Sequence, residues 1–255
     1  MLKLKNISKT FSKGTARELR VLDQINFEIS KGEFAILLGN NGSGKSTLLK
    51  TISGELNADS GELFLNGNNV TFLPAYKRSK YLFYVQQSRD SNLVPNLSVI
   101  DLFMLAKNQN SPLYKILRKK NWYENIVSHL SSFKNGLENR IGEQIWSLSG
   151  GEHQMITLLI AAEVIKNNPK TSNLLLLDEH IAHLDPNAAK TVMEFTTQLI
   201  KEYGLTTLMV THNITIAQRY GNRILAINNN NIVYDHKYDF NETRDINQLL
   251  ELISP

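Results

Sequence analysis

Apolar and polar residues follow two different patterns along the chain. They alternate, with Gly and Asn at the breaks, in three stretches: LKLKNI (2–7), INFEI (25–29) and ELFLNG (62–67). Alternation is typical of strands with one buried face, so these stretches predict an antiparallel β patch. Three other stretches are apolar almost throughout: EFAILLG (33–39), NLLLLDE (173–179) and TTLMVTH (206–212). Strands buried on both faces of a parallel sheet have this composition, so we expect an α/β core.

The ends of these three buried strands carry the candidate chemistry. Each strand is followed by polar residues, and ligands of open parallel sheets bind beyond the carboxyl ends of the strands. A ligand site is therefore expected at one edge of the core.

A helical pattern occupies the middle of the chain. Ser98 can cap the apolar run SVIDLFMLA (98–106), and apolar positions recur three and four residues apart in NWYENIVSHLSSF (121–133). We predict a helical subdomain over about 91–165, inserted into one α/β domain formed by about 1–90 and 166–255. The four asparagines at 228–231 lie between two apolar stretches and predict a hairpin turn, because Asn tolerates the left-handed backbone.

Composition narrows the class of protein. Hydrophobic residues make up 42% of the chain and charged residues 20%, which is typical of a globular fold. Cysteine is absent, so any metal must bind oxygen or imidazole groups. A net charge of +4 is usual for solubility, and we expect no nucleic acid partner. The longest mostly apolar region, MITLLIAAEVI (155–165), is too short to span a bilayer, and no apolar signal block is evident at the N-terminus.

The stretch GNNGSGKST follows the first buried strand and precedes a predicted helix, which is the context of a phosphate loop. Its glycines let backbone N–H groups converge on a phosphate at the start of the helix. Lys45 would reach the β and γ oxygens of a nucleotide, and Ser46 would ligate Mg²⁺ through its hydroxyl. The phosphate loop comprises nine candidate binding residues: Gly39, Asn40, Asn41, Gly42, Ser43, Gly44, Lys45, Ser46 and Thr47.

Two adjacent carboxylates end the strand LLLLDEH. Asp178 can hold Mg²⁺, and Glu179 can polarise a water for attack on the γ-phosphate. Carboxylates at the end of an apolar strand are costly to place without a cation or a hydrogen-bond partner. The alternative interpretation is that the pair caps the following helix.

A second glycine loop lies far along the chain, in WSLSGGEHQM (146–155). Ser149, Gly150, Gly151 and Glu152 stand at the start of a predicted helix and can also offer backbone N–H groups to a phosphate. Considered alone, His212 after a strand, Gln87 in YVQQS and Phe11 in SKTFSKG are weak signals, because such residues occupy such places for many reasons.

Taken together and in order, Phe11, GNNGSGKST, Gln87, LSGGEHQ, LLLLDEHIAHLDP and His212 resemble the nucleotide-binding subunit of an ATP-binding cassette (ABC) transporter over nearly the whole chain. The resemblance implies an ATPase of the phosphate-loop NTPase fold that uses ATP and Mg²⁺. It implies that Phe11 stacks on adenine and that Gln87 senses Mg²⁺, as a ligand beside Ser46 and Asp178, and the membrane partner. It also implies that Asp185 lies on a dimer seam and that His212 contacts the γ-phosphate, with Glu179 and Lys45 catalytic.

The resemblance also implies how the second glycine loop is used. In such proteins two subunits pair head to tail, and the loop of one subunit covers the ATP held by the phosphate loop of the other. We therefore expect a homodimer with two equivalent sites. It would drive a separate membrane permease, served by an extracytoplasmic solute receptor, from the cytoplasmic face of the cell membrane.

Some positions depart from the family pattern. His180 follows the expected base where many members have proline, His153 stands where arginine is common, and AAEVI (161–165) replaces an Arg-Ala-Leu run. None of these changes removes a required group. The motifs LLLLDEH, HLDP and LTTLMVTHN are most similar to importer ATPases associated with receptors for aromatic amino acids and related small solutes.

Two other classes of function stay open. A soluble ATP switch acting on nucleic acid or ribosomes shares these motifs, but such proteins usually carry two cassettes, a long coiled coil or zinc-binding cysteines. A small-molecule kinase or GTPase shares the phosphate loop. The sequence has no Asn-Lys-x-Asp guanine-binding motif, and LSGGE would then have no role.

Overall fold

The computed structural model describes residues 1–88, 93–107, 122–133, 136–167, 174–238 and 250–251. The chain forms two compact units. The first comprises Met1–Tyr84, Lys170–Glu179 and Gly204–Pro255, and the second comprises Val85–Pro169 and His180–Tyr203. The division into domains at about residues 90 and 165 stays a prediction, because compact packing and independent folding are different properties.

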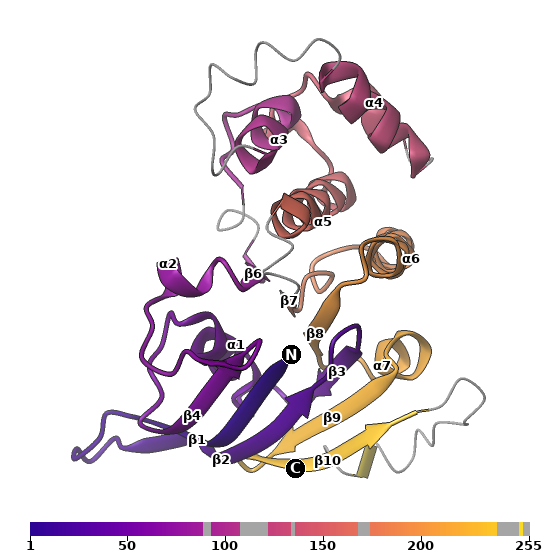
Figure 1. Cartoon of the computed structure of the whole chain (residues 1–255). Helices are drawn as coiled ribbons and strands as arrows, with labels where there is room; N and C mark the ends of the chain where they lie inside the picture. Colours follow the sequence, from indigo (N-terminus) through magenta and orange to yellow (C-terminus); the bar gives the residue numbers. More distant parts are fainter. Residues whose placement is uncertain (89–92, 108–121, 134–135, 168–173, 239–249, 252–255) are drawn as a thin grey trace. The chain divides into compact units, whose positions relative to one another are not determined.

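An antiparallel sheet forms one layer of the first unit (Figure 1). Its strand order is β2-β1-β4-β5, and the strands are β1 (Leu2–Phe11), β2 (Leu19–Ile29), β4 (Ser60–Leu65) and β5 (Asn68–Asn69). Buried and more exposed residues alternate along much of β2, from Leu22 to Ile29, as the sequence pattern predicts. The antiparallel β patch is confirmed.

A six-stranded sheet forms the second layer, in the order β10-β9-β3-β8-β7-β6. The strands are β3 (Phe34–Leu38), β6 (Leu82–Val85), β7 (Leu174–Asp178), β8 (Thr206–Thr211), β9 (Arg223–Asn228) and β10 (Asn231–Lys237). Every residue of β3, β7 and β8 is buried. These three strands run parallel, with Leu38 opposite Thr211 and Asp178 opposite Val210, so their carboxyl ends meet at one edge as predicted.

Three helices belong to the first unit: α1 (Lys45–Ser53), α2 (Ala75–Arg78) and α7 (Ile214–Tyr220). One hydrophobic core joins both sheets to α1, since Leu48, Leu49 and Ile52 of that helix pack in the same cluster as residues of β1 and β8. Helix α1 is the next element after β3, so this packing fixes both ends of the loop that connects them. Its start therefore lies at the carboxyl edge of the parallel strands.

The asparagine run forms the predicted hairpin turn between β9 and β10. Asn229 and Asn230 have φ angles of 46° and 68°, a left-handed conformation that Asn tolerates better than most residues. The carbonyl of Asn230 accepts a hydrogen bond from the backbone N–H of Asp23 at 2.9 Å. The turn thus also ties β2 of the antiparallel sheet to the edge of the second sheet.

The second unit is helical. It contains α3 (Val99–Lys107), α4 (Trp122–Ser132), α5 (Gly150–Asn167) and α6 (Pro186–Tyr203), with short 3₁₀ turns at Leu137–Arg140 and Ile145–Ser147. Ser98 caps α3 as predicted: its hydroxyl accepts the Asp101 N–H at 3.3 Å, and the Asp101 carboxylate accepts the Ser98 N–H at 3.1 Å. Helix α5 packs against α3 and α6.

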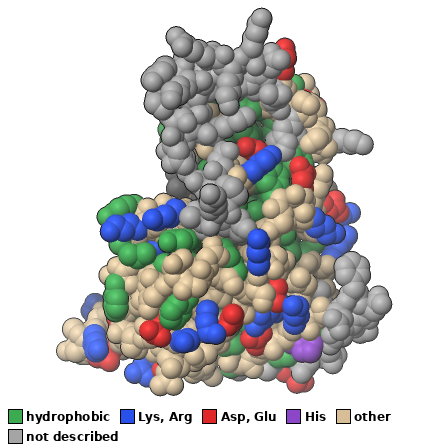
Figure 2. Space-filling view, viewed as in Figure 1, with side chains coloured by type: hydrophobic (Ala, Val, Ile, Leu, Met, Phe, Trp, Pro, Cys, Tyr) green, Lys and Arg blue, Asp and Glu red, His purple; other side chains and the backbone are tan. Residues whose placement is uncertain are grey.

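Charge on the visible surface is mixed. In Figure 2, Lys and Arg side chains are interspersed with Asp and Glu side chains over the first unit. Among the described residues, no helix combines the length and the apolar character needed to cross a bilayer.

A buried arginine holds the segment before β6 in place. Arg78 is 1% exposed, and burial lowers the pKa of its guanidinium. The guanidinium donates hydrogen bonds of 2.7 to 3.0 Å to four backbone carbonyls: those of Thr51, Ile52, Thr71 and Leu73. These bonds connect the end of α1 to α2 and to the turn after β5.

We expect Arg78→Leu to lower the free energy of unfolding by about 3 kcal/mol, because several buried carbonyls lose their donor at once. Lys77→Leu, at the exposed neighbouring position of α2, should change it by less than about 0.5 kcal/mol. Urea unfolding followed by circular dichroism measures both variants. Equal stability of the two variants would contradict the structural role of Arg78.

Candidate functional site

The phosphate loop connects β3 to α1 in a conformation that two glycines permit. A Cβ at Gly39 would lie 2.6 Å from the Ser43 Oγ and 2.7 Å from the Ile227 carbonyl oxygen. Gly44 has a φ of 98°, and a Cβ there would lie 2.7 Å from the Val21 carbonyl oxygen. Both positions therefore exclude larger residues, and the loop closes tightly over the start of α1.

Lys45 is the first residue of α1 and is 5% exposed. Its ammonium group donates to the carbonyls of Gly39 and Asn40, each at 2.8 Å. Burial lowers the pKa of Lys45, and the negative charges of Glu179 and Asp178 oppose that shift. The ammonium thus lies inside the loop, held by groups that an anionic ligand can replace.

The Ser43 hydroxyl provides a test of whether the loop fits a phosphate. Its Oγ is buried and has no hydrogen-bond partner. A buried polar atom without a partner costs free energy, and a phosphate oxygen would accept its proton. The Ser43 side chain, the buried ammonium and the start of a helix together fit a polyphosphate ligand.

Asp178 ends β7 and is 3% exposed. Its Oδ1 accepts a hydrogen bond from the Ser46 hydroxyl at 3.1 Å, and its Oδ2 accepts one from the Tyr84 hydroxyl at 2.9 Å. Burial raises the pKa of Asp178, aided by the charge of Glu179, while the bonds from Tyr84 and Ser46 counteract the shift. Two oxygen-bearing side chains from different segments, Ser46 and Asp178, thus meet as the sequence predicts.

Glu179 follows Asp178 with a φ of 45°, which is uncommon for a residue other than glycine. Its N–H donates to the Val210 carbonyl at 3.1 Å, which fixes this backbone against β8. The Oε1 lies 3.2 Å from His212 Nδ1 and 3.9 Å from Lys45 Nζ. Glu179, His212 and Lys45 therefore converge, although they come from three separate motifs.

The alternative role of these carboxylates, as caps of the next helix, is filled by another residue. Helix α6 begins at Pro186, and the Asp185 Oδ1 accepts the N–H groups of Asn187 and Ala188, each at 3.0 Å. Asp185 is thus the N-terminal cap of α6.

Two further predicted residues, Phe11 and Gln87, come from other segments of the chain. Phe11 ends β1 in the first unit; the residue is 37% exposed, and the Lys9 ammonium lies 5.7 Å from the centre of its ring. An exposed ring is free to stack on a flat ligand. Gln87 is exposed and belongs to the second unit, just after β6.

The second glycine loop, Ser149–Glu152, begins α5 in the second unit. The Ser149 N–H donates to the Glu152 carboxylate at 2.8 Å, and the Glu152 N–H approaches the Ser149 Oγ at 3.4 Å. Arg140 lies 3.1 Å from the same carboxylate. Burial opposes ionisation of Glu152, but the Ser149 bonds and Arg140 outweigh it and hold its pKa below the ordinary value.

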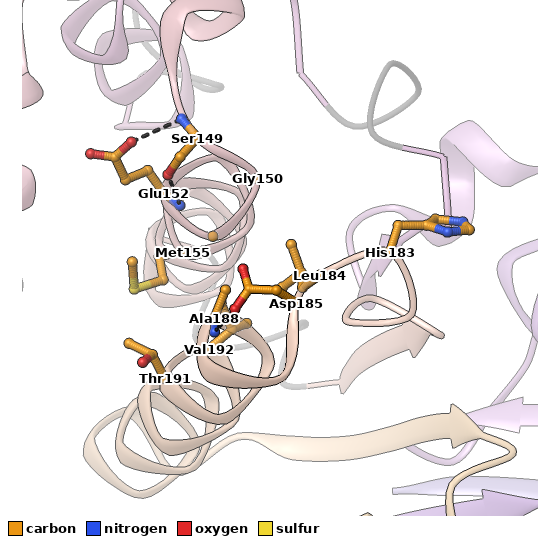
Figure 3. A pocket seen from close by; sticks show the side chains of 11 residues that line it. Ser149, Gly150, Glu152, Met155, His183, Leu184, Asp185, Ala188, Thr191 and Val192 are labelled. Carbon is orange, nitrogen blue, oxygen red and sulfur yellow. Dashed lines mark hydrogen bonds between the residues drawn. The ribbon is translucent and has the colours of Figure 1, made fainter.

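A pocket of about 300 Å³ adjoins this loop. Figure 3 shows Ser149 and Glu152 joined by hydrogen bonds at the start of α5, with Leu184 and Asp185 on the segment before α6. The lining is completed by Gly150, Gly151, Met155, His183, Ala188, Thr191 and Val192. The structure therefore brings Asp185 together with the second glycine loop, in one concave surface of the second unit.

The position after the carboxylate pair is filled by a buried imidazole. Burial lowers the pKa of His180 to about 3, so the ring is neutral. Its Nε2 lies 3.3 Å from the Thr196 hydroxyl on α6. Histidine here packs inside the second unit, with its neutral ring against α6.

Sequence reasoning missed two residues of these sites. Tyr84 contacts Asp178, and Arg140 pairs with Glu152. The only feature of the sequence that could have indicated Tyr84 is its hydroxyl group, which stands near the end of a short, mostly apolar strand. Arg140 lies in a 3₁₀ turn with no motif, and no signal in the sequence indicates it.

Comparison with known proteins identifies the family of the chain. A family model described as ABC transporter matches residues 22–182. The tyrosine transport ATP-binding protein of Clostridioides difficile (strain R20291) is 34% identical over 253 residues, covering 98% of each chain. The phosphonates import ATP-binding protein PhnC of Lactococcus lactis subsp. lactis (strain IL1403) is 32% identical over 237 residues, covering 92% of each chain.

Solved structures show the same fold. The dimeric ABC transporter cassette MJ0796 superposes with a TM-score of 0.73 at 26% identity, covering 94% of this chain and 99% of that one. The cbiO1 protein of Clostridium perfringens, part of the ABC transporter complex cbiONQ, has a TM-score of 0.75 at 25% identity and covers 92% of this chain and 88% of its own. With its phosphate loop, paired carboxylates and second glycine loop, the chain belongs to the ABC transporter family, as an ATP-binding subunit with the phosphate-loop NTPase fold.

Proposed function

We propose that the chain is the ATP-hydrolysing subunit of an importer for a small solute and works as a homodimer on a separate membrane permease. ATP hydrolysis is the activity of the ABC subunits that it resembles. The observation that carries the proposal is the convergence of Lys45, Glu179 and His212 beside the Ser46 and Asp178 pair, at the carboxyl edge of the parallel strands.

The phosphate loop would bind the β and γ phosphates. Backbone N–H groups at the start of α1 would donate to the phosphate oxygens. The Lys45 ammonium would exchange the carbonyls of Gly39 and Asn40 for these oxygens. The Ser43 hydroxyl, which is buried without a partner, would gain an acceptor. Phe11 would stack on the adenine with its exposed ring.

Glu179 is positioned to act as general base. Its carboxylate would accept a proton from a water whose oxygen attacks the γ phosphorus, while the bond to the β-phosphate oxygen breaks and ADP leaves. The backbone of Glu179 is fixed by the bond from its N–H to the Val210 carbonyl, and its Oε1 lies 3.2 Å from His212 Nδ1. His212, with 53% of its side chain exposed, has room to turn toward the γ-phosphate.

Ser46 and Asp178 would hold Mg²⁺, with Gln87 as a third protein ligand. Bound Mg²⁺ would neutralise charge on the phosphate oxygens. Within the described parts of the chain, no group of three or more His, Cys, Asp or Glu residues could hold a metal. An oxygen pair such as Ser46 and Asp178 is the kind of incomplete site that Mg²⁺ uses when phosphates supply the other ligands.

The second glycine loop would act on the ATP of a second copy. Its N–H groups at the start of α5 are suited to a γ-phosphate, and Asp185 beside it would contact the neighbouring chain. The solved MJ0796 cassette is described as dimeric, which supports this arrangement. A two-fold pair would contain two equivalent ATP sites.

The relatives support import over a role on nucleic acid. One is named for tyrosine transport and another for phosphonate import. We propose an aromatic amino acid or a related small solute as cargo, delivered by an extracytoplasmic receptor to a permease. The chain would lie at the cytoplasmic face of the membrane, bound to that permease.

Replacing the base should stop hydrolysis while leaving nucleotide binding intact. We expect Glu179→Gln to lower the rate of ATP hydrolysis by about 10² to 10⁴-fold, because the amide cannot accept the proton. Phosphate release measures the rate, and light scattering with ATP and Mg²⁺ should detect a dimer. Glu194→Gln, an exposed position on α6, is the matched control and should keep the rate. A fully active Glu179→Gln protein would exclude Glu179 as the base.

The dimer should depend on the second glycine loop. Adding Ser149→Arg to Glu179→Gln should abolish the ATP-dependent dimer, because a bulky cation would fill the space intended for the γ-phosphate. ATP binding to the monomer should persist, since Ser149 and the phosphate loop lie in different units. Ser131→Arg, on the exposed face of α4, is the control. A dimer that survives Ser149→Arg would show that pairing uses another surface.

Transport itself tests the whole proposal. The chain, reconstituted with its permease and receptor in lipid vesicles, should drive ATP-dependent uptake of labelled tyrosine. Glu179→Gln vesicles are the control and should show none. Uptake of a phosphonate in place of tyrosine would assign the other cargo class, and ATP hydrolysis without uptake of any solute would contradict import.

A further inference from the structure

Tyr84 makes a contact with the candidate metal site that no motif predicts. It lies on β6, beside β7 at the edge of the six-stranded sheet. Its hydroxyl donates to Asp178 Oδ2 at 2.9 Å, while the Ser46 hydroxyl donates to Oδ1 at 3.1 Å. The two oxygens of one carboxylate are therefore held by two different segments of the chain.

This division determines which oxygen can face a cation. The Asp178 carboxylate could rotate about its bond to Cβ and exchange Oδ1 for Oδ2, if nothing fixed it. The bond from Tyr84 opposes that rotation and leaves Oδ1 beside Ser46. Ligating carboxylates in metal sites generally accept a second hydrogen bond of this kind, which orients them toward the metal.

Tyr84 itself is held in place by packing. It is half-buried, and its ring packs against the core that α1 and β7 share. The ring and the strand thus position the hydroxyl before any ligand binds. A donor fixed in advance costs little conformational entropy when the site is filled.

We propose that Tyr84 is a positioning residue for Mg²⁺, which orients the Asp178 carboxylate through Oδ2 so that Oδ1 and Ser46 face the cation. The hydroxyl acts through Asp178 and touches neither the metal nor the phosphates. The proposal rests on the proposed function, because it assigns the cation to Ser46 and Asp178. It goes beyond that function by assigning a role in metal binding to a residue of β6 that does not itself contact the metal.

The experiment compares two affinities in the full-length Glu179→Gln protein, which should not hydrolyse ATP. One is the affinity for ATP with Mn²⁺, an analogue of Mg²⁺ visible by electron paramagnetic resonance, and the other is the affinity for ATP in EDTA. Their ratio reports only the contribution of the metal. We expect Tyr84→Phe to lower this ratio by about 10-fold and to change the resonance signal of bound Mn²⁺. Removing a hydrogen-bond partner of a metal ligand typically lowers the metal affinity by at least that factor.

A matched control separates orientation from packing. Tyr81, three residues earlier, also packs its ring against this core, and the Lys80 ammonium lies 5.8 Å from the ring centre. Tyr81→Phe should leave the ratio unchanged. In the protein with Glu179 intact, Tyr84→Phe should raise the Mg²⁺ concentration for half-maximal hydrolysis by about 10-fold and leave the rate at saturating Mg²⁺ within about twofold.

Each other outcome counts against the proposal. An unchanged ratio in Tyr84→Phe would overturn it, and so would an equal loss of ATP affinity with Mn²⁺ and in EDTA, which would indicate a structural role alone. Tyr84→Met, a flexible apolar replacement, provides the same comparison if Tyr84→Phe does not fold. If the parent Glu179→Gln protein gains no affinity for ATP from Mn²⁺, the proposed metal site fails, independently of Tyr84.

Discussion

Placing two adjacent carboxylates at the end of a fully buried strand is the constraint on which the rest of the site depends. A charge removed from water needs partners, and Asp178 obtains them from Ser46 and Tyr84. Glu179 obtains them from His212 and the more distant Lys45. The parallel strands β3, β7 and β8 must therefore end at one edge, because the segments at their ends supply most of these groups, and β6 must lie beside β7 to supply Tyr84.

The sequence predicts the strands of both sheets, but not how the polar side chains at their ends are partnered. Alternating and continuous apolar runs identify strands through burial, which is a local property of each strand. The convergence of Ser46 with Asp178 was also predictable, since parallel strands bring their carboxyl ends together. The hydrogen bond from Tyr84 to Asp178 was not predictable, because it depends on how β6 is placed beside β7. A single contact between two side chains produces no periodic pattern in the sequence. The role of Arg78 could not be predicted either. Its four acceptors are backbone carbonyls, and because every residue has one, they leave no signal in the sequence.

The two groups of candidate site residues belong to different units of the chain. The phosphate loop, the carboxylates and His212 belong to the first unit, and the second glycine loop with Asp185 belongs to the second. Glu179 is the last residue of its segment in the first unit, and the buried ring of His180 begins the next segment of the second. The proposed base is thus the residue at which the chain passes from the first unit to the second. Its backbone N–H is bonded to the Val210 carbonyl of β8, in the first unit.

The left-handed backbone at Glu179 restricts how this position can change during evolution. A φ of 45° is strongly unfavourable for residues branched at Cβ, such as Val, Ile and Thr, and is best tolerated by Gly, Asn and Asp. Descendants of this protein that lose hydrolysis but keep the fold would therefore accumulate a narrow set of replacements here. A relative with Gly or Asn at this position is consistent with a cassette that keeps this turn and still binds nucleotide, whereas Ile or Val would strain the turn.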